Sequence, residues 1–96
     1  MKKFKDLVFK QHPNGRGIQA VSIFDNGYGV SVVRFSIFGS YASYTDDENE
    51  FELAIVEGDE KSFSLCYDSG ITENVIGHLT RYEVSSVMLQ VQNLKR

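Results

Sequence analysis

Few side chains in this sequence are suited to chemistry, because it holds only two histidines, one cysteine and thirteen acidic residues. His12 precedes a proline in a turn signal and His78 stands in a link between elements, so we expect both to be structural or exposed. Their spacing matches no common set of zinc ligands. Cys66 alternates with Leu65 and Tyr67 in a strand-like run, which predicts a buried or half-buried thiol that is not activated. We therefore expect no catalytic site, no metal site, no cofactor and no enzymatic activity.

The acidic residues are concentrated in one part of the chain. Eight of the thirteen lie between residues 46 and 60, a stretch without lysine or arginine, whereas five of the ten basic residues lie within the first sixteen. Such a cluster is typical of solvated loops and of charges that protect an edge strand. It is also typical of a patch that binds a basic protein surface, for example one that normally holds nucleic acid. The patch itself is not expected to bind nucleic acid, because phosphate contacts need lysine or arginine.

The segment 39–49 is longer than an ordinary hairpin loop, and it carries Tyr41 and Tyr44 beside the first acids. Tyrosine combines rigid apolar area with a polar group and is typical of protein-recognition surfaces. In the alternative reading, one of these tyrosines folds back over the end of the sheet. The residues expected to contact a partner are Tyr28, Tyr41, Tyr44, Asp46, Asp47, Glu48, Glu50, Asp59 and Glu60.

A β-rich framework has to position these residues. The Asn26-Gly27 pair between two alternating apolar runs predicts a two-residue hairpin turn, because a type I′ turn needs positive φ at both central positions. That turn would pair Ile23 with Val30 and Val21 with Val32, and we assign this branched patch to the core. The opposite face, either solvated or covered by a partner, would carry the small residues Ala20, Ser22, Ser31 and Val33.

The periodicity of the remaining residues predicts the other elements. Alternation predicts five strands joined by short links, over residues 4–11, 17–25, 28–38, 50–56 and 62–68, followed by a short helical turn over 72–79. Helical spacing of apolar residues, behind a capping box at Thr80 and Glu83, predicts a helix over 81–94. The expected fold is one α+β domain over residues 1–96, an antiparallel five-stranded β-meander with a C-terminal amphipathic helix on one face.

Length and composition agree with one domain. The 96 residues are enough for a modest core without metal or disulfide staples, and an apolar content of 42% argues against disorder. The single cysteine excludes an intrachain disulfide and fits a reducing compartment. The basic start of the chain lacks the apolar region of a signal peptide, and no apolar run approaches the roughly 20 residues of a membrane span. We expect a cytoplasmic protein without membrane contacts.

Four strings of this sequence resemble small uncharacterised proteins encoded by tailed phages and prophages. They are NGYGVSVVRF from Asn26, FELAI from Phe51, CYDSGIT from Cys66 and VIGHLT from Val75. The resemblance extends from Leu7 to the C-terminal helix and brings no catalytic or binding residue with it. It implies a phage accessory protein, a group whose members often act by occupying a surface of a host factor.

The leading hypothesis is a non-enzymatic phage protein that binds a protein partner, such as a basic surface of a host defence complex, and inhibits it in the manner of an anti-CRISPR. The alternative is a structural or assembly protein that forms a homo-oligomer, for example a homodimer, through a sheet edge or the face with small residues. A weaker alternative is nucleic-acid binding through the basic N-terminal residues.

Overall fold

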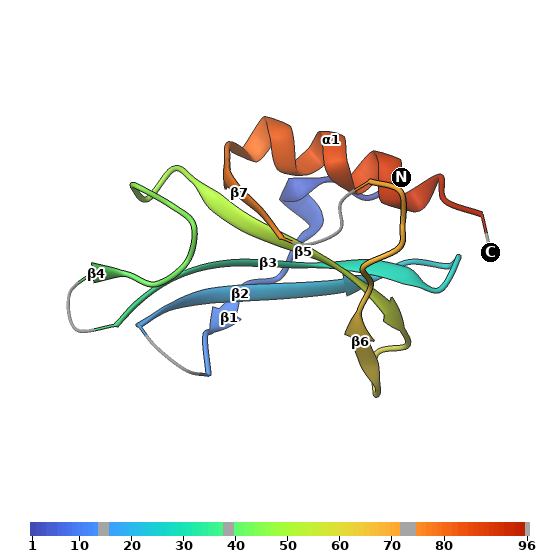
Figure 1. The fold of residues 1–96 in the computed structure, drawn as a ribbon, viewed down its shortest axis with the longest axis horizontal. Helices are drawn as coiled ribbons and strands as arrows, with labels where there is room; N and C mark the ends of the chain where they lie inside the picture. Colours follow the sequence, from blue (N-terminus) through green and yellow to red (C-terminus); the bar gives the residue numbers. More distant parts are fainter. Residues whose placement is uncertain (14–15, 38–39, 72–74, 96) are drawn as a thin grey trace.

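An antiparallel sheet with a C-terminal helix on one face forms the framework of the protein, which confirms the predicted α+β class (Figure 1). The computed structural model describes residues 1–13, 16–37, 40–71 and 75–95. Within these ranges the strands are β1 (Lys10–Gln11), β2 (Arg16–Ile23), β3 (Tyr28–Ile37), β4 (Ser40–Tyr41), β5 (Phe51–Gly58), β6 (Phe63–Leu65) and β7 (Ile76–Leu79). A 3₁₀ turn, η1 (Phe4–Asp6), precedes them, and α1 (Arg81–Gln92) follows.

The strands follow the chain order β1-β2-β3-β5-β6, with β4 beside β3 and β7 beside β5. The predicted meander is therefore present and is extended by two short strands. Both β6 and β7 lie along the same edge of β5, because β6 pairs with Val56–Gly58 and β7 pairs with Phe51 and Leu53. Both strands that follow β5 in the chain, β6 and β7, therefore pair with β5 itself.

The β2–β3 loop has one residue more than predicted. Phe24 N–H donates to the Tyr28 carbonyl at 2.7 Å and Gly27 N–H donates to the Phe24 carbonyl at 3.0 Å, so the loop is Asp25–Gly27. Gly27 has a φ of 83°, the left-handed conformation that ends a three-residue hairpin loop. The prediction of a two-residue turn is wrong.

This extra loop residue reverses which side chains of β2 face the helix and which face away from it. The strand pairs Ser22 with Val30 and Ala20 with Val32, so Ala20 is buried on the helix side. Val21 lies on the opposite face and is 39% exposed, although it was predicted in the core. A shift of one residue has this effect because side chains alternate along a strand.

The core lies between α1 and the sheet face that α1 covers. Its buried residues are Phe24, Val30, Val32, Phe51, Leu53, Ile55, Cys66, Leu79, Val84, Val87, Met88 and Val91. The predicted capping box is confirmed, because Glu83 N–H donates to the Thr80 hydroxyl at 3.2 Å and Thr80 N–H donates to the Glu83 carboxylate at 3.0 Å. The helix ends at Gln92, short of the predicted residue 94.

The N-terminal segment packs on the core without forming the strand predicted over residues 4–11. Phe4–Asp6 form η1, and only Lys10–Gln11 pair with β2. The Phe4 and Phe9 rings lie 5.0 and 5.8 Å from the Phe51 ring, centroid to centroid. The apolar alternation of this segment therefore reflects aromatic packing against the core rather than a sheet ladder.

Hydrogen bonds attach the start of the chain to α1. Lys2 N–H donates to Gln92 Oε1 at 2.8 Å, and Gln92 Nε2 donates to the Lys2 carbonyl at 2.8 Å. Phe4 N–H donates to the Ser85 hydroxyl at 2.9 Å. The N-terminal segment thus lies alongside the helix, on the same side of the sheet (Figure 1).

The helical turn predicted over residues 72–79 is wrong where the structure can test it. Residues 72–74 lie outside the described part, and Ile76–Leu79 form β7. Because β6 pairs only with the end of β5, the rest of that edge offers free backbone groups, and β7 satisfies them. Strand pairing over a long sequence distance here outweighs local preference.

The side chain of Asn26 connects the β2–β3 loop to the end of α1. Its Nδ2 donates to the carbonyls of Val91 and Leu94 at 2.9 and 3.0 Å, and its Oδ1 accepts from Tyr28 N–H at 3.1 Å. The last carbonyls of a helix have no partner within the helix. One amide side chain therefore satisfies both the helix end and the hairpin loop.

Replacement of this amide should destabilise the fold. Asn26→Ala should lower the free energy of unfolding by about 1–2 kcal/mol, because the helix carbonyls lose their donor. Asn26→Asp keeps the acceptor for Tyr28 but places a negative charge at the helix C-terminus, so it should destabilise at least as much. Urea denaturation measures both, and wild-type stability in Asn26→Asp would contradict the assignment.

Candidate functional site

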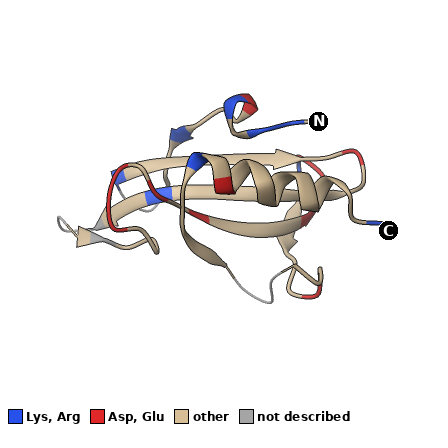
Figure 2. Ribbon diagram, turned by 90° about the horizontal axis from the view of Figure 1, so that it is seen from above, with Lys and Arg blue, Asp and Glu red and all other residues tan. Residues whose placement is uncertain are grey.

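Seven of the eight acidic residues between positions 46 and 60 form two groups toward opposite ends of β5 (Figure 2), and the eighth, Glu52, lies within the strand. The loop acids, Asp46, Asp47, Glu48 and Glu50, precede β5, and the hairpin acids, Glu57, Asp59 and Glu60, lie at its other end. The eight residues of β5 separate the groups by roughly 23 Å. An interface of ordinary size that is centred on one group would therefore leave the other group outside its rim.

The loop before β5 is fixed from inside by buried hydroxyl groups. Ser43 and Thr45 are buried, and their hydroxyl oxygens lie 2.9 Å apart. Ser43 Oγ also accepts from Phe35 N–H at 3.1 Å, and the Arg34 guanidinium donates to the Glu48 carbonyl. Tyr44, between the two buried residues, is 61% exposed. The loop thus holds Tyr44 outward, whereas the side chain of Tyr41, whose backbone lies in β4, is outside the described part.

Several predicted contact residues have structural roles. Asp47 Oδ1 accepts from Asn49 N–H at 2.7 Å, and Asp59 Oδ1 accepts from the N–H groups of Lys61 and Ser62 at 2.9 and 2.8 Å, which stabilises their turns. Tyr28 is half-buried against the core rather than projecting from the hairpin tip. The other predicted contact residues with exposed side chains are Tyr44, Asp46, Glu48 and Glu60, of which Asp46 also contacts His78.

A bulge in β7 turns His78 toward this loop. The β5–β7 register shifts by one residue between Phe51 and Leu53, and His78 has a φ of 56°, which is uncommon for a residue other than glycine. His78 N–H donates to the Tyr44 carbonyl at 2.8 Å. Gly77 leaves room for this approach, because a Cβ there would lie 2.4 Å from Tyr44 Cβ. The bulge and the loop are thus in direct backbone contact.

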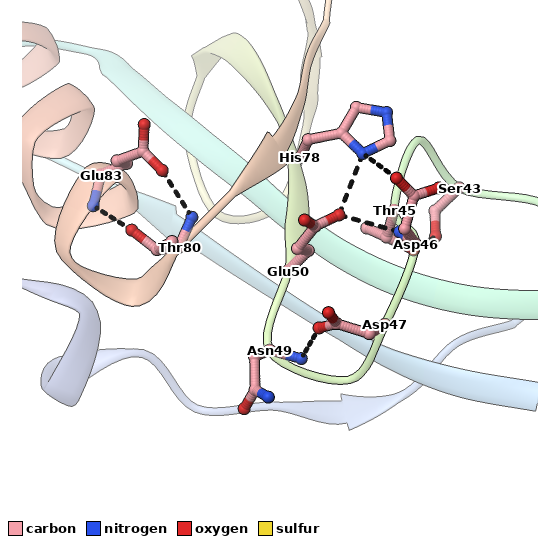
Figure 3. Close-up of polar contacts among 9 residues, drawn as sticks. All are labelled: Ser43, Thr45, Asp46, Asp47, Asn49, Glu50, His78, Thr80 and Glu83. Atoms are coloured by element: carbon pink, nitrogen blue, oxygen red, sulfur yellow. Dashed lines mark hydrogen bonds and ion pairs between the residues drawn. The ribbon is translucent and has the colours of Figure 1, made fainter.

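The imidazole of His78 meets two of the loop acids (Figure 3). His78 Nδ1 lies 2.9 Å from Glu50 Oε1 and 3.4 Å from Asp46 Oδ2. Glu50 Oε1 also accepts from Asp46 N–H at 2.8 Å. The side chains of His78, Glu50 and Asp46 are 51%, 25% and 82% exposed, so the cluster lies at the surface with Glu50 innermost.

This cluster shifts the protonation of both His78 and Glu50. The hydrogen bond to Glu50 raises the pKa of His78, and Asp46 adds to the effect. The backbone N–H of Asp46, followed by His78, lowers the pKa of Glu50. The arrangement therefore stabilises the protonated form of the His78 imidazole and the ionised form of the Glu50 carboxylate.

The sequence did not reveal this cluster, because Glu50 and His78 are 28 residues apart and meet only through β5–β7 pairing.

The other histidine and the cysteine lie outside this cluster. His12 is buried, with its ring stacked on Phe35 at 3.9 Å between centroids. Cys66 is 3% exposed, as predicted, and burial raises the pKa of its thiol. Cys66 Sγ donates to Asp68 Oδ1 at 3.4 Å, so the thiol is held protonated and is a poor nucleophile.

Comparison of the chain with protein-family models, with curated proteins and with solved structures gave no match. At twelve residues, α1 falls short of a membrane span, and the described ranges hold no other candidate. Two features of the described residues are suited to binding, namely the fixed loop with exposed Tyr44 and the His78 cluster.

The contribution of the His78 cluster to stability should depend on pH. The folded state raises the pKa of His78, so this contribution is present below the ordinary value of 6.5 and is lost as pH rises through the raised pKa. For Glu50 the pKa is lowered, so its contribution is present above 4.5 and is lost as pH falls. The cluster therefore stabilises the fold most between these two values.

An NMR titration of the His78 ring tests this expectation. The pKa of His78 should lie above 6.5 in the wild-type protein and should fall in Glu50→Gln, because the charged acceptor is lost. Glu48→Gln removes a neighbouring charge outside the cluster and serves as the control. Equal shifts in the two variants would show that general loop charge, not the Glu50 contact, sets the pKa.

Proposed function

We propose that this chain is a non-enzymatic protein that binds a protein partner through the loop 44–50. The observation that carries the proposal is the exposure of Tyr44 beside Asp46 and Glu48 on a loop whose inner residues are buried and hydrogen-bonded to the sheet. A loop that is already ordered loses little conformational freedom on binding. A larger part of the free energy of its contacts with the partner therefore contributes to the binding affinity.

The chemistry of the loop favours a basic partner surface. Besides Tyr44 it presents the loop acids, and a tyrosine among carboxylates suits arginine, which stacks on aromatic rings and pairs with carboxylates. Complementary charge also accelerates encounter and disfavours acidic partners. The hairpin acids, at the far end of β5, contribute to long-range steering rather than to the same contact.

The biological setting of the proposal comes from the sequence resemblance to small phage and prophage proteins. In the proposed setting the chain is a phage accessory protein that acts in the host cytoplasm. There it occupies a basic surface of a host defence complex, as an anti-CRISPR does. Defence complexes that bind nucleic acid carry basic surfaces, which an acidic protein can cover.

A matched pair of variants tests the contact surface. Tyr44→Ala/Glu48→Lys alters the loop, and Tyr67→Ala/Glu60→Lys makes the same chemical change elsewhere, at a tyrosine that is 56% exposed and at another exposed acid. In affinity capture from a host lysate, the first variant should retain at least about tenfold less of the partner that the wild-type protein captures, because aromatic anchors dominate interface energy. The second should retain it fully.

Both variants should give the circular dichroism spectrum and the melting temperature of the wild-type protein, since the altered side chains are exposed. Equal capture by the two variants would place the contact surface outside the loop. A partner lost from both would indicate that total charge alone governs the interaction.

A second candidate function is assembly with another copy of the chain, and the open face of the sheet favours it. Opposite α1, Val21, Phe63 and Leu65 are 39%, 43% and 46% exposed. Leu65 of β6 pairs with Val56 of β5, and Val56 pairs on its other side with Gly29 of β3. Apolar side chains on this face therefore extend from β6 to β5. The predicted small-residue face is thus changed: Ala20 and Ser22 belong to the helix side, and the open face carries larger apolar groups.

Sedimentation velocity decides whether this face assembles. A homo-oligomer should dissociate in Val21→Lys, because the charge would be buried in the interface. Val8→Lys, at a residue that is 73% exposed outside the sheet, is the control and should leave the assembly intact. A monomer at every concentration of the wild-type protein would exclude this second function.

A further inference from the structure

We propose that Asp46, Glu50 and His78 form a binding site for a divalent transition-metal ion, with Zn²⁺ as the best match. This site shares Asp46 and Glu50 with the loop proposed above to bind a protein partner, but metal binding can be tested without that partner. Its three potential donor atoms, Asp46 Oδ2, Glu50 Oε1 and His78 Nδ1, all lie within 4.8 Å of one another. They come from three different backbone positions that converge on one point (Figure 3).

The distance between His78 Nδ1 and Asp46 Oδ2 already fits tetrahedral coordination. With Zn–N and Zn–O bonds of about 2.0–2.2 Å, neighbouring ligand atoms lie about 3.3–3.6 Å apart. The separation of His78 Nδ1 from Asp46 Oδ2, 3.4 Å, falls within this range, and the 2.9 Å to Glu50 Oε1 has to widen by roughly half an ångström. Rotation of two surface side chains supplies such a change without moving the backbone.

The donor types favour zinc over hard cations. Imidazole nitrogen is a ligand for Zn²⁺, Cu²⁺ and Ni²⁺, whereas Ca²⁺ takes six to eight oxygens and Mg²⁺ prefers an octahedral oxygen shell. The two carboxylates balance the charge of a divalent cation, and binding of the ion displaces the proton from His78 Nδ1. Three protein ligands would leave one tetrahedral position for water or for a group from another molecule.

The backbone holds two of the three ligands in place. The β7 bulge, with its φ of 56° at His78, directs the imidazole to the loop, and the His78 N–H bond to the Tyr44 carbonyl fixes the bulge there. The Asp46 N–H group orients the Glu50 carboxylate. Such outer hydrogen bonds orient the ligands of metal sites. Asp46, which is 82% exposed, is the least constrained and would complete the site.

A second group of potential ligands serves as an internal comparison. Glu57, Cys66 and Asp68 also bring donor atoms within 4.8 Å of one another. Cys66 is only 3% exposed there, so an ion from solution has little access to its thiol. The His78 cluster lies at the surface, so an ion can reach it directly.

Isothermal titration calorimetry with Zn²⁺ on the tag-free protein tests the site. The wild-type protein should bind one ion per chain. His78→Asn should weaken binding by at least about tenfold, the smallest loss typical of removing even an outer hydrogen bond of a metal site. Asparagine is chosen because it tolerates positive φ, so the bulge can persist. Glu50→Gln, which leaves the bulge unchanged, should weaken binding in the same way.

Two control variants complete the design. Cys66→Ser removes the thiol of the comparison cluster and Glu48→Gln removes a loop charge outside the site, so both should bind Zn²⁺ as the wild-type protein does. Absence of saturable binding to the wild-type protein would overturn the proposal, as would unchanged binding in both His78→Asn and Glu50→Gln. Displacement of Zn²⁺ by an equal concentration of Ca²⁺ or Mg²⁺ would also overturn it, because it would indicate attraction to carboxylates alone.

Discussion

The three-residue loop of the β2–β3 hairpin is the constraint on which the rest of the structure depends. Gly27 adopts the positive φ that closes the loop, and this choice decides which residues of β2 face the helix. Ala20 rather than Val21 lies on the helix side of the sheet, where the large apolar side chains of β3 and β5 fill the core. Asn26 then connects the same loop to the C-terminus of α1, so the two layers are joined at both their faces and their ends.

The features that the sequence predicts correctly are those that depend on neighbouring residues. The capping box of Thr80, the apolar spacing of α1 and the strands β2, β3 and β5 follow from local patterns. The hairpin register could not be predicted, because two- and three-residue loops both accept Asn-Gly, and a side-chain contact with the distant α1 accompanies the observed one. Likewise β7 and η1 owe their structure to β5 and to aromatic packing, not to their own residues.

The candidate site illustrates the same limit. Tyr44 and the loop acids stand out in the sequence by composition, and the structure keeps Tyr44 exposed. The meeting of His78 with Glu50 requires a bulge, a glycine without a Cβ beside Tyr44 and a strand paired across 28 residues. None of these three features produces a periodic pattern in the amino-acid sequence. Sequence patterns thus show which residues are available to a surface, whereas long-range pairing decides which of them meet.

The reciprocal hydrogen bonds between Lys2 and Gln92 place both ends of the chain at one corner of the molecule (Figure 1). The molecule is 40 Å along its longest axis, and the loop that precedes β5 lies toward the other end of it. A surface attachment, fluorophore or fusion partner joined at either terminus would therefore stand away from Tyr44 and His78. Attachment there would leave the loop before β5 accessible to solution.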